Sequence, residues 1–114
     1  MAVAMFMSWP GVTSDQYDAM MARLELDANP AAGGVFHLSA LTDDGLEVCE
    51  VWQTEQAFHG FLTQRMLPIA TELEMEGEPE IRLIPLHNMY AMDPDMVDRI
   101  GAVSLPPAVG GWAV

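Results

Sequence analysis

The 114-residue chain has no lysine and only four arginines, against 17 acidic residues, and its formal net charge is −13. So few cations cannot form the basic face that neutralises phosphates, which argues against nucleic acid as a partner. Anionic membrane surfaces are disfavoured for the same reason. We therefore expect no nucleic-acid partner and no membrane partner.

Cysteine is almost absent as well. Cys49 stands alone, which excludes an internal disulfide framework and a Cys-based zinc module. No run approaches the roughly 18 apolar residues of a membrane span. The apolar segment 1–11 is short, and it has no basic residue ahead of it. This indicates a strand and not a signal peptide. We expect a cytoplasmic protein.

Apolar residues make up 51% of the chain, a globular composition, and the length suits one domain. Four apolar stretches are typical of β-strands: residues 2–9, 35–41, 46–52 and 81–92. Asp44-Gly45 predicts a hairpin turn between the second and third of them. Pro85 in the last stretch favours an edge or bulge position.

Two amphipathic helices are predicted between these strands. Thr13 and Gln16 match a capping box, and apolar residues follow at helical spacing as far as Leu24. Thr54 is a suitable N-cap for the second helix, whose apolar face continues to Leu73. Pro68 lies inside the second helix and should kink it or split it in two.

The predicted order β-α-β-β-α-β is that of the ferredoxin-like α+β fold. We expect a four-stranded antiparallel sheet in the order 4-1-3-2, with both helices on one face. The strands are apolar on both faces, and no third helix precedes residue 93. Burial of the uncovered face against a second copy is the economical solution, which predicts a homodimer.

Residues 93–114 form a separate C-terminal tail after a domain at residues 1–92. Asp93-Pro94 predicts a short helix to about Ile100, and a Pro/Gly-rich stretch follows. This tail is either a free terminus or an arm that docks on the partner subunit. The second interpretation depends on apolar residues that are costly to expose: Ile100, Val103, Leu105 and Trp112.

Several segments carry a family resemblance: WPGVT at 9–13 with QYD at 16–18, GGVFH at 33–37, EVWQTE at 50–55, Phe61 with RMLP at 65–68, and HNMY at 87–90. With them, residues 1 to about 92 resemble the small dimeric α/β-barrel proteins of the antibiotic-biosynthesis-monooxygenase-like group. The resemblance implies ferredoxin-like subunits that pair into a dimeric α/β barrel. Its functional implication is broad, because the superfamily includes cofactor-free quinone-forming monooxygenases, polyketide cyclases and haem enzymes.

The hairpin brings together the most informative side chains. A two-residue turn at Asp44-Gly45 pairs His37 with Trp52, whereas a four-residue loop pairs His37 with Glu50. Both registers put the same residues on one face: His37, Ser39, Glu50 and Trp52. The opposite face is mostly apolar: Phe36, Leu38, Ala40, Cys49 and Val51. We therefore expect the apolar set to pack on the helices and the His37 set to face the barrel interior.

A histidine beside a carboxylate can be held in one tautomer and made more basic. His37 with Glu50 can therefore act as a general base on an acidic carbon or a phenol. The alternative is a buried polar pair that fixes the interface. The resemblance favours His87 as a further catalytic candidate, with a structural histidine as the alternative. Which face of the last strand lines the barrel stays open.

Aromatic and thioether side chains supply the candidate ligand-binding residues. Trp52 can stack on a flat aromatic substrate, and Tyr17 can direct its hydroxyl into the cavity. Phe61, Met66 and Tyr90 complete this candidate set. Ordinary core packing is the alternative for Trp52 and Tyr17.

No cofactor is expected. The three histidines show no tight ligand spacing, which disfavours a metal, and no Gly-rich phosphate loop follows a strand. Haem, which the resemblance introduces, needs an axial histidine such as His37 or His87 and stays an alternative.

Three functions remain open at this point. The first is a small homodimeric enzyme without cofactor, a monooxygenase or a cyclase, acting on a hydrophobic aromatic or polyketide-like molecule through a histidine base. The second is a non-catalytic dimer that binds an apolar ligand or serves a stress response. The third is a haem-binding barrel.

Overall fold

The computed structural model describes residues 1–101 of the chain. The elements follow in this order: β1 (Val3–Pro10), α1 (Ser14–Leu24), β2 (Gly34–Thr42), β3 (Gly45–Trp52), α2 (Glu55–Phe61), the π-helix η1 (Leu62–Met66), α3 (Leu67–Glu72), β4 (Glu80–Pro85) and α4 (Pro94–Ile100). Among residues 1–101, none of the helices has the length and hydropathy of a membrane span.

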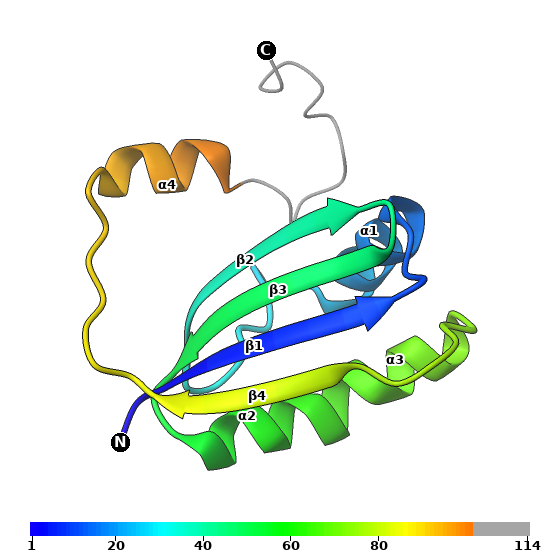
Figure 1. The fold of residues 1–114 in the computed structure, drawn as a ribbon, viewed down its shortest axis with the longest axis horizontal. Helices are drawn as coiled ribbons and strands as arrows, with labels where there is room; N and C mark the ends of the chain where they lie inside the picture. The colour runs from blue at the N-terminus through cyan, green and yellow to red at the C-terminus, as the bar shows by residue number, and fades with distance from the viewer. Residues whose placement is uncertain (102–114) are drawn as a thin grey trace.

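The four strands form one antiparallel sheet in the order β2-β3-β1-β4. Helices α1, α2 and α3 lie on one face of it, behind the strands in Figure 1. The α+β ferredoxin-like fold and its strand order are confirmed. β4 is an edge strand, as Pro85 indicates.

The core lies between this sheet and the helices. Alternate residues of β1 are buried there, and Met5 is fully buried. Met5 lies opposite Glu50 in the sheet, and Glu50 lies opposite His37 on β2. His37, Glu50 and Trp52 therefore face the helices.

The predicted orientation of the hairpin is thus wrong. The residues that were expected to pack on the helices lie instead on the opposite, open face of the sheet, which carries no helix: Phe36, Leu38, Ala40, Cys49 and Val51. The polar row can be buried because its hydrogen-bonding groups bond one another, which removes most of the cost of burial. Apolar Leu38 instead stays 47% exposed on the open face.

The hairpin adopts one of the two predicted registers. Thr42 pairs with Gly45, so His37 lies opposite Glu50 and not opposite Trp52. The Thr42 side chain accepts hydrogen bonds from the backbone of Asp44 and Gly45, which closes the turn. Gly45 has φ +145°, and a Cβ there would lie 2.4 Å from the Trp9 carbonyl oxygen. Glycine is therefore needed where the hairpin crosses the end of β1.

Both helix starts are confirmed. Thr13 and Gln16 form the reciprocal capping box of α1, and Thr54 accepts a hydrogen bond from the Ala57 backbone at the start of α2. Pro68 was expected to kink the second helix or split it in two, and the helical backbone instead continues through a π-helix just before it. Pro68 has no N–H to donate, and the chain passes through η1 before α3 begins at Leu67.

The last strand is shorter than the predicted 81–92. Pro85 pairs with Val3, the first residue of β1, so the residues after Leu86 have no partner strand there. Residues 87–93 are exposed and irregular, and α4 lies apart from the sheet in Figure 1. α4 occupies the range in which a short helix was expected. The arm that carries Val103, Leu105 and Trp112 lies outside the described residues.

Candidate functional site

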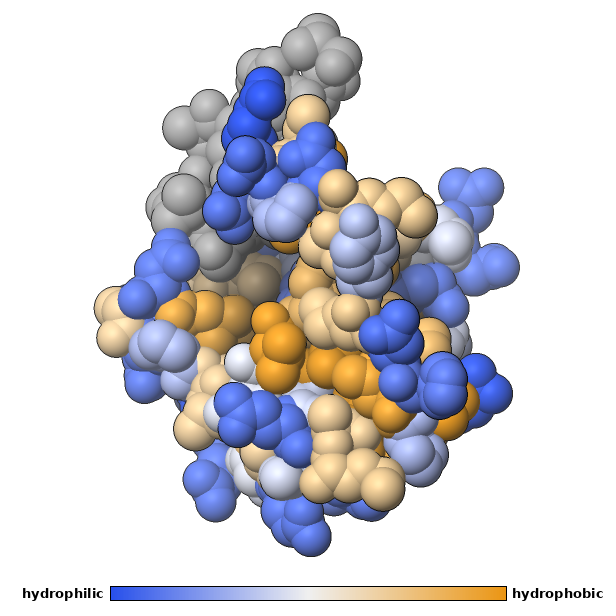
Figure 2. Space-filling view, turned by 90° about the vertical axis from the view of Figure 1, so that its left-hand side faces the viewer, coloured by the Kyte–Doolittle hydropathy of each residue, from blue (hydrophilic) through white to orange (hydrophobic). Residues whose placement is uncertain are grey.

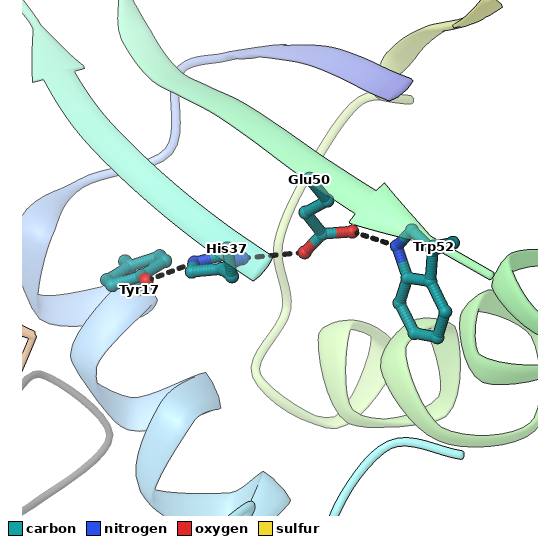
Figure 3. Close-up of polar contacts among 4 residues, drawn as sticks. All are labelled: Tyr17, His37, Glu50 and Trp52. Carbon is teal, nitrogen blue, oxygen red and sulfur yellow. Dashed lines mark hydrogen bonds and ion pairs between the residues drawn. The ribbon is translucent and has the colours of Figure 1, made fainter. Parts of the chain in front are cut away.

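Four side chains from three elements form one hydrogen-bonded chain (Figure 3). The Tyr17 hydroxyl lies 2.7 Å from His37 Nε2, and His37 Nδ1 lies 2.6 Å from Glu50 Oε2. The Trp52 indole N–H donates to Glu50 Oε1 over 2.8 Å. α1 supplies the tyrosine, β2 the histidine, and β3 the last two residues.

The chemistry of the end groups fixes the direction of these bonds. An indole N–H can only donate, so Glu50 Oε1 is an acceptor. An ionised Glu50 accepts at both oxygens, which places a proton on His37 Nδ1 and leaves Nε2 as the nitrogen that can gain or lose one. Tyr17 donates to Nε2 when the imidazole is neutral. The chain thus holds His37 in the tautomer that a general base needs.

Tyr17 is suited to stay a protonated donor. Burial raises the pKa of its phenol above the ordinary value of 10.0, the nearby Ser39 hydroxyl lowers it in part, and the negative charges of Glu50 and Asp18 raise it further. Its ring lies nearly coplanar with the His37 ring, with planes 12° from parallel and centroids 6.1 Å apart, so the hydroxyl meets Nε2 end to end. Tyr17 therefore orients the imidazole through its hydroxyl.

This raised pKa predicts an alkaline loss of stability. Below pH 10 the phenol is protonated in both states, and above it the unfolded chain releases the proton first. The free energy of unfolding should therefore fall as pH rises above 10, and fall less steeply in Tyr17→Phe. Urea unfolding between pH 9 and pH 11 measures this.

The comparison needs a Cys49→Ala background, because burial also raises the pKa of the Cys49 thiol above 9.0. In that background, the free energy of unfolding could fall equally steeply with pH with and without the Tyr17 hydroxyl. That result would contradict the raised pKa of Tyr17.

Two spaces meet at the His37–Glu50 pair. An inner cavity of about 40 Å³ lies between the sheet and the helices, and an open pocket of about 240 Å³ lies beside it. Both are lined by His37, Glu50, Leu26 and Phe61. The His37 side chain is 28% exposed and that of Glu50 is 10% exposed, so the pair is reachable but mostly shielded from water.

The open pocket is lined by two aromatic rings and by a loop. Trp52 contacts Phe61 with ring centroids 5.3 Å apart, and both line the pocket. The connection between α1 and β2, including Pro30 and Ala31, also lines the pocket. A planar apolar molecule bound in this pocket would contact His37 and Glu50, which both line it.

Arg65 holds this connecting loop in place. Its guanidinium donates to the backbone carbonyls of Leu24, Asn29 and Pro30, and it lies 5.4 Å from the centre of the Phe61 ring. In the sequence, Arg65 belongs to a segment that carries the family resemblance, but no role for its guanidinium follows from that. An arginine inside a helix, three residues before Pro68, carries no signal for a loop that lies 35 or more residues away in the chain.

Six of the eight candidate residues lie together. Each of these six lines the inner cavity, the open pocket or both: Tyr17, His37, Glu50, Trp52, Phe61 and Met66. His87 and Tyr90 lie on the exposed segment after β4 and line neither space.

The arrangement of the side chains disfavours a bound metal ion and a bound haem at this site. Within residues 1–101 no three histidine, cysteine, aspartate or glutamate side chains lie close enough to hold one ion. Both nitrogens of His37 are bonded to Tyr17 and Glu50, so an axial bond to haem iron would have to break one of these contacts.

Neither the known protein families nor the curated proteins include a match to this sequence. Solved structures do match its fold. The cofactor-independent oxygenase SnoaB from Streptomyces nogalater is 22% identical with a TM-score of 0.54, over 77% of this chain and 94% of that one. A candidate antibiotic biosynthesis monooxygenase from Chloroflexus aurantiacus J-10-fl is 16% identical with a TM-score of 0.52, over 79% and 98%. The chain therefore has the fold of the antibiotic-biosynthesis-monooxygenase-like proteins.

Proposed function

We propose that the protein is a cofactor-independent oxygenase for a planar, apolar phenol, with His37 as the general base. The observation that carries the proposal is that His37 and Glu50, hydrogen-bonded to each other and through His37 to Tyr17, line an apolar pocket. The likeness to SnoaB, which is described as a cofactor-independent oxygenase, supports the reaction class. The phenolic substrate is inferred from the two aromatic rings that line the pocket and from the single base.

The proposed reaction begins with the substrate hydroxyl replacing the Tyr17 hydroxyl at His37 Nε2. Nε2 takes the phenol proton, and the Glu50 carboxylate stabilises the imidazolium that forms. Ser39 offers the displaced Tyr17 hydroxyl another partner. The protein thereby supplies an electron-rich phenolate inside a site that excludes most water.

The oxidation itself balances without a further reductant. The phenolate carbon para to the oxygen reacts with dioxygen, the C–H bond there breaks, and the O–O bond cleaves. One oxygen atom becomes the second carbonyl of a quinone, and the other leaves as water with the two hydrogens lost by the phenol. The electrons for reducing dioxygen come from the substrate, so no cofactor is proposed.

A turnover assay tests the proposal. Purified protein, treated with a chelator, is incubated with polycyclic phenols under air while oxygen uptake and quinone absorbance are followed. Equimolar oxygen uptake and quinone formation are expected. A product that forms equally well under argon would instead identify a cyclase. Saturable binding with no product would identify a ligand-binding protein.

We also propose that the open face of the sheet pairs with a second copy, as in a dimeric α/β barrel. Apolar side chains on that face are exposed: Phe6 is 38% exposed, Leu38 is 47% and Ile84 is 41%. This face points toward the viewer in Figure 1, and Figure 2, turned by 90°, also shows apolar residues exposed on the left-hand side of the molecule. Such exposure is typical of an interface.

Leu38→Glu is expected to dissociate this dimer. It places a charge near Glu47 on the same face in both subunits, which should raise the dissociation constant by about 10²-fold or more. Analytical ultracentrifugation measures it, with Met92→Glu on the exposed segment after β4 as the matched control. A monomeric parent protein, or an undisturbed Leu38→Glu dimer, would contradict this interface.

A further inference from the structure

The inner cavity is walled almost entirely by apolar side chains. Four methionines are among them: Met7, Met20, Met21 and Met66. Its volume of about 40 Å³ is roughly three times what one water-sized molecule needs, which is far too little for a polycyclic ring system. It can therefore hold only very small molecules.

The polar atoms at its edge are already engaged. Tyr17 and both nitrogens of His37 are hydrogen-bonded, and each oxygen of Glu50 accepts one bond. Within residues 1–101 no buried side-chain nitrogen or oxygen lacks a partner. A water in this cavity would lose the two to four hydrogen bonds that buried waters make, whereas an apolar gas would lose none. The chemistry of the walls favours a dry cavity.

We propose that this cavity is a binding site for dioxygen, separate from the pocket that takes the phenol. This inference rests on the proposed function, and it adds a binding site for dioxygen, the second substrate. His37, Glu50, Leu26 and Phe61 line both spaces, so gas in the cavity adjoins an aromatic ring in the pocket. Leu26 and Phe61 are the apolar side chains shared by both spaces, so a rotamer change of either would connect the cavity with the pocket.

Dioxygen itself is the first probe, because it is paramagnetic and speeds the relaxation of nearby nuclei. Protein labelled at the methionine methyls is compared by NMR under oxygen and under nitrogen pressure. The Met20, Met21 and Met66 methyls should relax several-fold faster under oxygen than the Met5 methyl. Met5 is the matched control, since it is fully buried in the same core but does not line the cavity. Equal enhancement at Met5 would overturn the proposal.

Filling the cavity is the second test. Val48→Leu adds a methylene to its wall, whereas Val3→Leu adds the same group on the same sheet face outside it. Val48→Leu should raise the KM for dioxygen several-fold and leave the KM for the phenol unchanged. Val3→Leu should change neither, and thermal melting checks that both variants fold. Equal KM values for dioxygen in both variants would overturn the proposal.

The two proposals can fail separately. If no phenol is oxidised but the methyls lining the cavity respond to dioxygen, the gas site stands and the oxygenase assignment falls. If phenols are oxidised while these methyls relax like Met5, the oxygenase assignment stands and the gas site falls.

Discussion

His37→Gln is expected to lower kcat for phenol oxidation by about 10²- to 10⁴-fold, the usual contribution of a positioned general base. Glutamine has a similar reach and keeps polar contacts to Tyr17 and Glu50, but its amide cannot take up a proton at neutral pH. The expected loss corresponds to about 3 to 5 kcal/mol of transition-state stabilisation. Steady-state kinetics on the purified variant measure it, and ligand titration checks that the phenol still binds.

Two other histidines provide comparisons for this variant. His59 lies on the exposed side of α2, 3.4 Å from Glu55, and His59→Gln should keep the parent rate. His87→Gln examines the catalytic role that the family resemblance favours. Its exposed position after β4 predicts no loss. Wild-type turnover by His37→Gln, or a comparable loss in His87→Gln, would remove His37 from the role of base.

Glu50→Gln is expected to reduce kcat by a similar factor, about 10²- to 10⁴-fold, because it changes the tautomer of His37. The Trp52 N–H needs an acceptor, so the glutamine oxygen should turn toward it and the amide NH₂ toward His37 Nδ1. Nδ1 must then accept a hydrogen bond, and the ring proton moves to Nε2. A protonated Nε2 cannot serve as the base.

The readout is the tautomer itself. NMR of ¹⁵N-labelled histidine should show the His37 proton on Nδ1 in the parent protein and on Nε2 in Glu50→Gln. Glu55→Gln is the matched control, because it removes the carboxylate beside exposed His59 and leaves the site intact. Loss of activity with an unchanged tautomer, or a changed tautomer with full activity, would refute this positioning role.

Much of the fold could be predicted from the sequence because its signals are local. The Thr13 capping box and the Thr54 N-cap each depend on neighbouring residues, and the structure contains both. The pairing of His37 with Glu50 was one of two registers allowed by the hairpin. The Thr42 contacts in the turn select between them.

The orientation of the hairpin could not be predicted in this way. Their apolar character favoured burial of the face that carries Phe36 and Leu38. Which face of the hairpin is buried depends, however, on long-range contacts. Tyr17 comes from a separate helix to bond His37, and Glu50 lies opposite Met5 of β1. Likewise, β4 ends where β1 offers no further partner, which the apolar run to residue 92 does not reveal. Neither the Arg65 bonds to the loop nor the inner cavity follows from local sequence.

The central claim is that His37 ionises a phenol bound next to it before dioxygen reacts. The most direct measurement mixes the protein with a polycyclic phenol in the absence of oxygen, at a pH well below the pKa of the free phenol, and records the absorption spectrum. The wild-type protein should produce the red-shifted band of the bound phenolate, and His37→Gln should bind the phenol without that band. Admission of oxygen should then convert the band to that of a quinone. A wild-type complex that stays un-ionised yet forms quinone when oxygen enters would contradict the account.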